Sequence, residues 1–243
     1  MLQLQLKNVY SEYAVGLIME FGRIFGVRDI HNEPCTVVND PDAERFGLIA
    51  DTKPIILQTA VDMTQPSNLF RAQYIYQLAY GLTQYALRQQ KPDPDVIVKW
   101  FENTVCDAMA IYMLEQLANN WRRYADTANL NADDVCDMKL YACEQQYAHA
   151  EKDVLDYCRD LNDLKLIEAD SDINRKDRGQ SRNYILNTLR IPDMDRSISQ
   201  ISDYTQYIND DKLTIDFERW ADESRQHALL IANLGDIQPN IES

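Results

Sequence analysis

The chain has 243 residues, of which 45% are hydrophobic and 26% charged, so it is long enough to bury a core without disulfide bonds. Its five cysteines include no C-x2-C pair, the first 25 residues lack a secretory signal pattern, and no apolar run approaches the roughly 18 residues of a membrane span. A formal net charge of −15 opposes direct binding to nucleic acid or anionic lipid. We therefore expect a cytoplasmic protein that contacts neither nucleic acid nor membrane.

The negative charge is concentrated in the C-terminal half of the chain. Residues 126–243 contain 25 acidic and 13 basic side chains, whereas residues 1–125 contain 14 acidic and 11 basic ones. Such an acidic surface increases solubility or attracts a positively charged protein. We expect a protein partner that is basic and engages the C-terminal half, and the sequence leaves the oligomeric state open.

The low glycine content and the helical periodicity of most of the chain predict an α+β protein that is predominantly helical, with a small strand region at its N-terminus. Strands are expected at residues 2–6, where leucine alternates with glutamine, and at residues 55–60. Between them, Ser11 is expected to begin a helix that Gly26 ends. The segment that contains Pro34 and Pro41 is typical of a loop.

Three long helices are expected in the middle of the chain. The first follows Pro66 and ends before Pro92, and the second spans about residues 95–124 with an apolar arc so wide that it predicts a central, buried helix. The third begins at Asn131 and runs to about residue 166. It carries a heptad pattern that predicts burial against a long partner helix, formed by Cys136, Leu140, Cys143, Tyr147, Ala150, Val154, Tyr157, Leu161 and Leu164.

Three further helices are expected after residue 181, where apolar residues again recur at helical spacing. The charged segment 168–181 has few large apolar residues and is predicted to be a linker or loop. The predicted organisation is therefore an α+β domain over residues 1–167 that includes the long helix, followed by the linker and by C-terminal helices over residues 182–243. We expect these last helices to pack on the same core.

Two neighbouring helices carry the most informative pattern of the sequence. Residues 80–84 read Y-G-L-T-Q on the first helix and residues 103–107 read N-T-V-C-D on the second, with a predicted strand before them. This arrangement resembles the zincin-like metallopeptidases that have H-E-x-x-H on one helix and E-x-x-x-D on the next. The resemblance covers about 60 residues and implies a zincin-like core of a strand and two helices.

The zinc-binding residues of that family are replaced in this chain. The resemblance aligns Tyr80 and Gln84 with the two histidine ligands, Gly81 with the general base and Asn103 with the third ligand, while Asp107 keeps the family's aspartate. A protonated phenol and neutral amides are poor zinc ligands, and glycine cannot act as a base. The resemblance therefore implies a pseudo-metallopeptidase without metal or other cofactor, which acts as a protein-binding or regulatory module.

An ordinary helical bundle would also show the apolar stripe of the first helix, but it does not predict a glycine in mid-helix, which costs roughly 1 kcal/mol relative to alanine. A bundle also leaves unexplained a row of polar residues on another face of the same helix. The members of this row are Gln73, Gln77, Tyr80, Gln84 and Arg88. A second interpretation is therefore that the row forms a hydrogen-bonded network with Asn103 and Asp107 in place of a metal.

Carboxylates recur at helical spacing in the C-terminal half, at Asp153, Asp156, Asp160 and Asp163. Like charges on one helical face repel one another by a few tenths of a kcal/mol per pair, so this row is either a solvated surface or a binding site for a basic partner. If the row is a binding site, this chain is expected to be an acidic inhibitor or immunity-type protein. A third hypothesis is a hydrolase with a relocated active site, although the three histidines lie in no recognisable catalytic motif.

Overall fold

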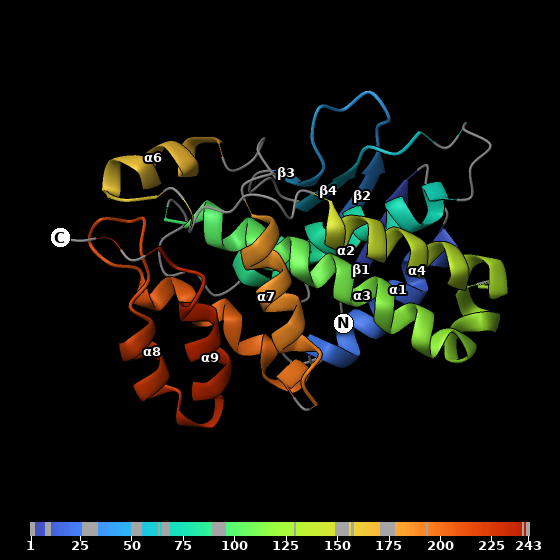
Figure 1. The fold of residues 1–243 in the computed structure, drawn as a ribbon. Coiled ribbons are helices and arrows are strands. Elements are labelled where there is room, and N and C mark those ends of the chain that lie inside the picture. The colour runs from blue at the N-terminus through green and yellow to red at the C-terminus, as the bar shows by residue number, and fades with distance from the viewer. Residues whose placement is uncertain are drawn as a thin grey trace. The chain divides into compact units, whose positions relative to one another are not determined.

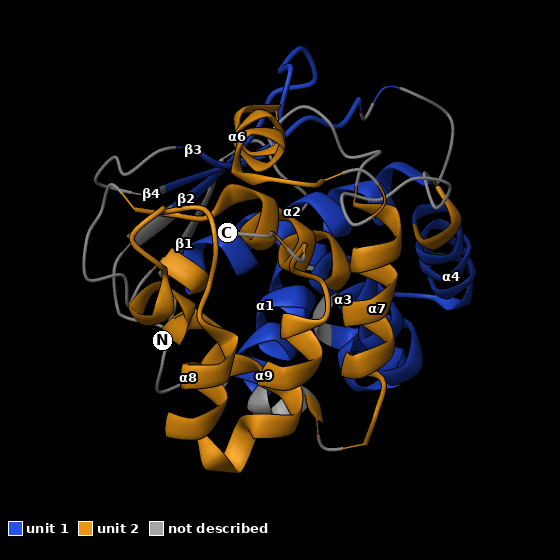
Figure 2. Ribbon diagram, turned by 60° about the vertical axis from the view of Figure 1, so that its left-hand side comes forward, with its two compact units in different colours: residues 1–86, 109–145 blue, residues 87–108, 146–243 orange. Residues whose placement is uncertain are grey.

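A computed structural model shows an α+β protein that is predominantly helical, as predicted (Figure 1). The structure describes residues 3–7, 11–25, 34–49, 55–62, 64, 69–88, 96–128, 130–148, 156, 158–170, 178–192, 194–239 and 241. No helix within these ranges is long and apolar enough to cross a membrane. The chain divides into two compact units, unit 1 with residues 1–86 and 109–145 and unit 2 with residues 87–108 and 146–243 (Figure 2).

Unit 1 contains a four-stranded sheet in the order β1-β2-β4-β3. Strands β1 (Gln3–Lys7), β2 (Pro34–Asn39) and β4 (Ile55–Thr59) are parallel, and the short β3 (Gly47–Ile49) pairs antiparallel with β4 at the edge. Parallel neighbours require a crossover connection, which helix α1 (Ser11–Phe25) supplies between β1 and β2. In Figure 1, β2, β3 and β4 lie in the upper part of the view, above α1.

The two predicted strands and the helix that begins at Ser11 are confirmed, but the loop predicted around Pro34 is wrong, because that segment forms β2. Pro34 is the first residue of the strand, a position that tolerates a residue without a backbone N–H. Strand β3 is only three residues long, so no alternation in the sequence could indicate it.

Helices α2 (Leu69–Arg88) and α3 (Lys99–Ala128) confirm the predicted helix pair, and the division between the units falls inside each of them. Every residue from 100 to 114 of α3 is buried, as its wide apolar arc predicted. Every residue from 74 to 87 of α2 is buried as well, although the sequence predicted an apolar stripe on only one face of that helix. Unit 1 also buries a carboxylate, and its partners come from the same unit. Glu20 of α1 accepts hydrogen bonds from the Tyr124 hydroxyl and, at 3.4 Å, from the Asn120 amide of α3.

Helix α4 (Ala132–Tyr147) begins as predicted, because Asn131 Oδ1 accepts the backbone N–H groups of Asp133 and Asp134 at 2.8 and 3.1 Å. It does not continue to residue 166, so the prediction of a single long helix is wrong. Residues 158–160 are not helical, and a separate helix, α6 (Leu161–Asp170), follows them. Asp160 caps α6 by accepting the N–H groups of residues 162 and 163 at 2.7 and 2.9 Å, and a cap of this kind marks a helix start.

The predicted burial of the heptad pattern is also wrong for α4. Its buried residues are Asp134, Met138 and Ala142. The heptad residues Cys136, Leu140, Cys143 and Tyr147 are exposed instead. Further along the pattern Leu161 is half-buried and Leu164 is buried, while residues 150, 154 and 157 lie outside the described part of the chain.

Unit 2 contains the C-terminal helices. Helix α7 (Gly179–Leu189), the 3-10 helix η1 (Met194–Tyr207), α8 (Phe217–Glu223), the 3-10 turn η2 (Arg225–His227) and α9 (Ala228–Gly235) pack on one another. Periodicity therefore located the helical stretches, although it did not distinguish η1 from an α-helix, and the last of the three predicted helices is divided into α8, η2 and α9. Residues 168–170 and 179–181, predicted as parts of a linker, are helical, and residues 171–177 are outside the described ranges.

Candidate functional site

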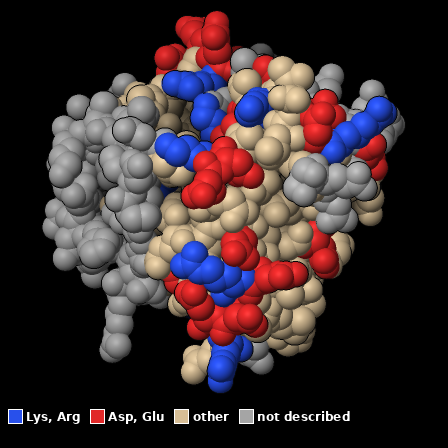
Figure 3. Space-filling model, turned by 90° about the vertical axis from the view of Figure 1, so that its left-hand side faces the viewer, with Lys and Arg blue, Asp and Glu red and all other residues tan. Residues whose placement is uncertain are grey.

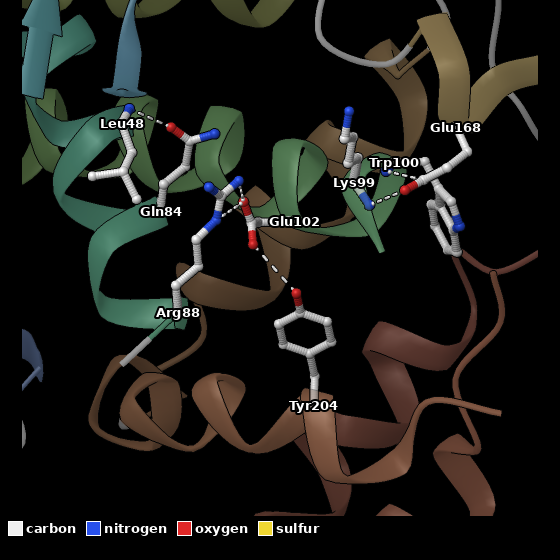
Figure 4. Close-up of polar contacts among 8 residues, drawn as sticks. All are labelled: Leu48, Gln84, Arg88, Lys99, Trp100, Glu102, Glu168 and Tyr204. Carbon is white, nitrogen blue, oxygen red and sulfur yellow. Dashed lines mark hydrogen bonds and ion pairs between the residues drawn. The ribbon is translucent and has the colours of Figure 1, made fainter. Parts of the chain in front are cut away.

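Helix α2 is attached to the sheet of unit 1 by two glutamines of the predicted polar row. Gln84 Oε1 accepts the backbone N–H of Leu48 in β3 at 2.8 Å (Figure 4). Gln77 uses both ends of its amide, since Oε1 accepts the Ala60 N–H at 2.6 Å and Nε2 donates to the Ala60 carbonyl at 3.4 Å. The edge strand and the residue after β4 thus obtain from side chains the hydrogen bonds that a neighbouring strand would otherwise provide.

The backbone of β3 approaches α2 closely at two glycines. A Cβ atom at Gly81 would lie 3.3 Å from the Leu57 side chain and 3.4 Å from the Gly47 backbone. Gly47 has a φ of +114°, which side-chain-bearing residues rarely adopt, and a Cβ atom there would lie 2.5 Å from Gln84 Oε1. The mid-helix glycine that the sequence left unexplained therefore allows the helix and the edge strand to meet.

Aromatic packing completes this region. The Tyr80 ring is buried and meets the ring of Phe46 edge to face, with centroids 5.3 Å apart. We call the arrangement of Phe46, Gly47 and Leu48 against Tyr80, Gly81 and Gln84 the β3–α2 contact. In this contact, all three motif residues predicted on α2 pack against the segment that contains β3.

The chemistry available at the β3–α2 contact is that of neutral groups. The Gln84 oxygen already accepts a backbone N–H, and the space beside Gly81 is filled by the strand. Among the residues that the structure describes, no group of three or more His, Cys, Asp or Glu side chains could hold a metal ion. These positions therefore offer neither a general base nor a set of metal ligands.

The other two motif residues, Asn103 and Asp107, belong to unit 2, and both are buried on α3. Asp107 Oδ2 accepts a hydrogen bond from Arg178 Nη2 at 3.0 Å, and both side chains of this ion pair are at most 3% exposed. Arg178 immediately precedes α7. The one residue that matches the family pattern therefore takes part in a buried ion pair within unit 2.

A second buried ion pair in unit 2 was not predicted. Glu102 is fully buried and accepts hydrogen bonds from Arg88 Nε at 2.8 Å and from the Tyr204 hydroxyl at 3.2 Å (Figure 4). Burial, followed by the Glu102 charge, raises the pKa of Tyr204. Burial alone would lower the pKa of Arg88, but Glu102 outweighs it and raises that pKa. The sequence feature that could have indicated this ion pair is Glu102 itself, a glutamate inside the otherwise apolar arc of α3.

Cys106 lies one turn after Glu102 on α3 and is fully buried. Burial, reinforced by the Glu102 charge, raises the pKa of its thiol well above the usual value. The thiolate is the reactive form of cysteine, so this environment suppresses nucleophilic chemistry. We call Arg88, Glu102, Cys106, Asp107, Arg178 and Tyr204 the ionic cluster of unit 2.

Glu168 of α6 caps the N-terminus of α3. Its two carboxylate oxygens accept the backbone N–H groups of Lys99 at 2.8 Å and Trp100 at 3.0 Å (Figure 4). Burial raises the pKa of Glu168 and outweighs these two hydrogen bonds, which lower it. A residue predicted to belong to a linker therefore satisfies two of the four N–H groups that have no partner at a helix start.

The predicted row of acidic residues does not lie on one continuous helix. Asp156 is exposed and accepts a long hydrogen bond of 3.4 Å from Gln180. Asp160 caps α6, and Asp163 in the first turn of that helix accepts the N–H of Arg159, which precedes it, at 3.0 Å. Asp153 is outside the described residues. On the face shown in Figure 3, acidic side chains gather at the lower end and are interleaved with basic ones.

No protein-family model, no curated protein and no solved structure matches this chain. The resemblance to zincin-like metallopeptidases therefore rests on the sequence of residues 80–84 and 103–107, and it stays a prediction.

Proposed function

We propose that this chain is a non-catalytic, zincin-like protein that acts as a protein-binding or regulatory module. The observation that carries the proposal is the use of Gln84, at the position of a zinc ligand, to bind the backbone of Leu48 at 2.8 Å. A catalytic zinc site needs ligands that face the metal and a position open to water. Here the corresponding helix face is covered by the protein's own edge strand.

The ionic cluster of unit 2 gives little support to a hydrolase with a relocated active site. Its two potential nucleophiles, Cys106 and Tyr204, are buried, and both have raised pKa values. The carboxylate beside Tyr204 belongs to Glu102, which is fully buried and paired with Arg88, so the structure exposes neither this base nor the two nucleophiles to a substrate. The cluster is better explained as a set of mutually satisfied charges.

Elemental analysis and a peptidase assay test the absence of catalysis. The purified chain is expected to contain no stoichiometric zinc and to leave unstructured peptides intact, because none of the motif positions on α2 and α3 is a histidine. One tightly held zinc per chain, or cleavage that a chelator abolishes, would contradict the proposal.

The family resemblance has a separate test, because non-catalytic binding does not depend on ancestry. The triple variant Tyr80→His, Gln84→His and Asn103→Glu restores the ligand types of the family and leaves Gly81 unchanged, where a Cβ atom would crowd β3. Both this variant and the Tyr80→His, Gln84→His double variant remove the Gln84 acceptor that holds β3 on this helix face, so the resemblance predicts that the triple variant takes up more zinc in equilibrium dialysis than the double variant. Equal uptake would overturn the resemblance and leave the non-catalytic function standing.

The acidic C-terminal half supports a basic protein as the partner, whether the chain regulates that partner or inhibits it. Asp156 is the best residue of the acidic row for a test, since it is exposed and caps no described helix. We expect basic proteins retained at low salt by the immobilised chain to be lost with Asp156→Lys and kept with the control Asp170→Lys, which changes an exposed carboxylate on α6. Equal retention by both variants would reject the row as the contact surface.

The proposal also places the protein in the cytoplasm. Cys106, Cys136, Cys143 and Cys158 are free thiols, which supports a reducing compartment.

A further inference from the structure

Helix α4 exposes a regular row of apolar and thiol side chains. Cys136, Leu140 and Cys143 follow one another at spacings of four and three, and Tyr147 at the last position of α4 continues the pattern. Leu140 is 50% exposed and Tyr147 is 71% exposed, and both cysteines are exposed as free thiols. We call these four residues the α4 stripe.

The α4 stripe lies on the side of the helix opposite to its buried face. At 3.6 residues per turn, the stripe is centred about 180° from Asp134, Met138 and Ala142, which are the buried residues of α4. An ordinary surface helix would place polar residues on the outer face. Spacings of four and three are also those of the a and d positions of a coiled coil, which are buried by a second helix.

The residues that flank the stripe differ in charge. In heptad terms Cys136 and Cys143 occupy d positions and Leu140 and Tyr147 occupy a positions. One flank then carries the carboxylates of Asp137 and Glu144 at e positions, and the other carries Lys139 at a g position. Two such helices side by side in parallel place each Lys139 against Glu144 of the other copy, whereas an antiparallel pair places the acidic flanks against each other.

We propose that α4 mediates a parallel homodimer of this chain, in which the α4 stripes of two copies pack on each other. The flanking charges argue for a second copy in this orientation, because only in the parallel pair does a basic position face an acidic position on both sides of the interface. The buried face of each helix points away from the dimer axis. The interface is short and joins two acidic chains, so we expect a weak dimer.

Sedimentation equilibrium of the reduced chain over about 1 to 500 μM tests for the dimer. The wild type is expected to dimerise reversibly, and Leu140→Lys to remain monomeric because it places two like charges in the centre of the interface. Leu166→Lys is the matched control, because Leu166 is a leucine of α6 with 68% exposure and should not affect dimerisation. A wild-type chain that is monomeric throughout, or a dimer that survives Leu140→Lys, would overturn the proposal.

Mild oxidation tests the orientation. In a parallel dimer each exposed cysteine faces its own counterpart, so Cys136→Ser and Cys143→Ser should each still form a disulfide-linked dimer, and the double variant should not. Loss of cross-linking in either single variant would indicate an antiparallel or displaced pair and contradict the parallel arrangement.

Charge exchange tests the flanks. Lys139→Glu and Glu144→Lys should each weaken dimerisation about tenfold by replacing two attractive pairs with two repulsive ones, and the double exchange should restore it. Single variants without effect, or a double exchange that fails to restore the dimer, would reject the pairing.

Discussion

The β3–α2 contact of unit 1 and the ionic cluster of unit 2 differ in the forces that hold them together. In the contact, neutral amides and two glycines fit a backbone closely against a helix. In the cluster, carboxylates and guanidinium groups are buried as ion pairs. The first depends on shape and the second on charge, so the two regions should respond to different substitutions.

The magnitudes differ as well. A neutral hydrogen bond contributes about 0.5–1.5 kcal/mol to stability, whereas removal of one partner from a buried ion pair costs about 3–5 kcal/mol because a buried charge is left without compensation. We therefore expect the ionic cluster to be more sensitive to single substitutions that remove a charge, and the β3–α2 contact to be more sensitive to added atoms.

The largest effect is expected for Glu102→Leu. This change leaves the Arg88 guanidinium and the Tyr204 hydroxyl without their carboxylate partner, and it should lower the free energy of unfolding in urea by about 3–5 kcal/mol. The double variant Glu102→Leu, Arg88→Met should recover much of this loss, because it removes both charges. A single variant that loses less than about 1 kcal/mol would show that the cluster is not held by charge.

Alanine substitution of two mid-helix glycines should separate crowding from helix propensity. A Cβ atom at Gly22 of α1 would have no neighbouring atom within 4 Å, so Gly22→Ala should stabilise the protein by about 0.5–1 kcal/mol. Gly81→Ala has the same propensity gain but places its methyl group 3.3 Å from Leu57 and 3.4 Å from the Gly47 backbone. We expect Gly81→Ala to be less stable than Gly22→Ala by about 1–2 kcal/mol in urea unfolding, and equal stabilisation by both would refute the close contact.

The smallest effect concerns the pH dependence of the cap on α3. Because burial raises the pKa of Glu168 above its usual 4.5, the folded state retains this proton more readily than the unfolded state does. The stabilisation linked to that proton is present below pH 4.5 and is lost as the pH rises through the folded pKa. As the pH rises from 4.5 through the folded pKa, the free energy of unfolding should therefore fall more steeply for the wild type than for Glu168→Gln. Parallel curves for the two proteins would contradict a raised pKa of Glu168.

The sequence was sufficient to predict the fold class and the helix pair, because prolines mark the ends of α2 and apolar residues fill the arc of α3. It also singled out Gly81 as anomalous. It could not supply the reason, because the contact involves a three-residue strand and a hydrogen bond between residues 36 positions apart. Periodicity likewise gave the spacing of the α4 stripe without indicating which face of the helix is buried.

Hydrogen exchange at the Leu48 amide tests most directly the central claim that motif position 84 holds the edge strand. Gln84→Met keeps the side-chain length but removes the acceptor of the Leu48 N–H, so this amide should exchange about tenfold or more faster than in the wild type. Gln77→Met is the matched control and should accelerate exchange at Ala60 while leaving Leu48 protected. If Leu48 exchanges at the same rate in the wild type and in Gln84→Met, position 84 does not hold the strand and the account of the β3–α2 contact is wrong.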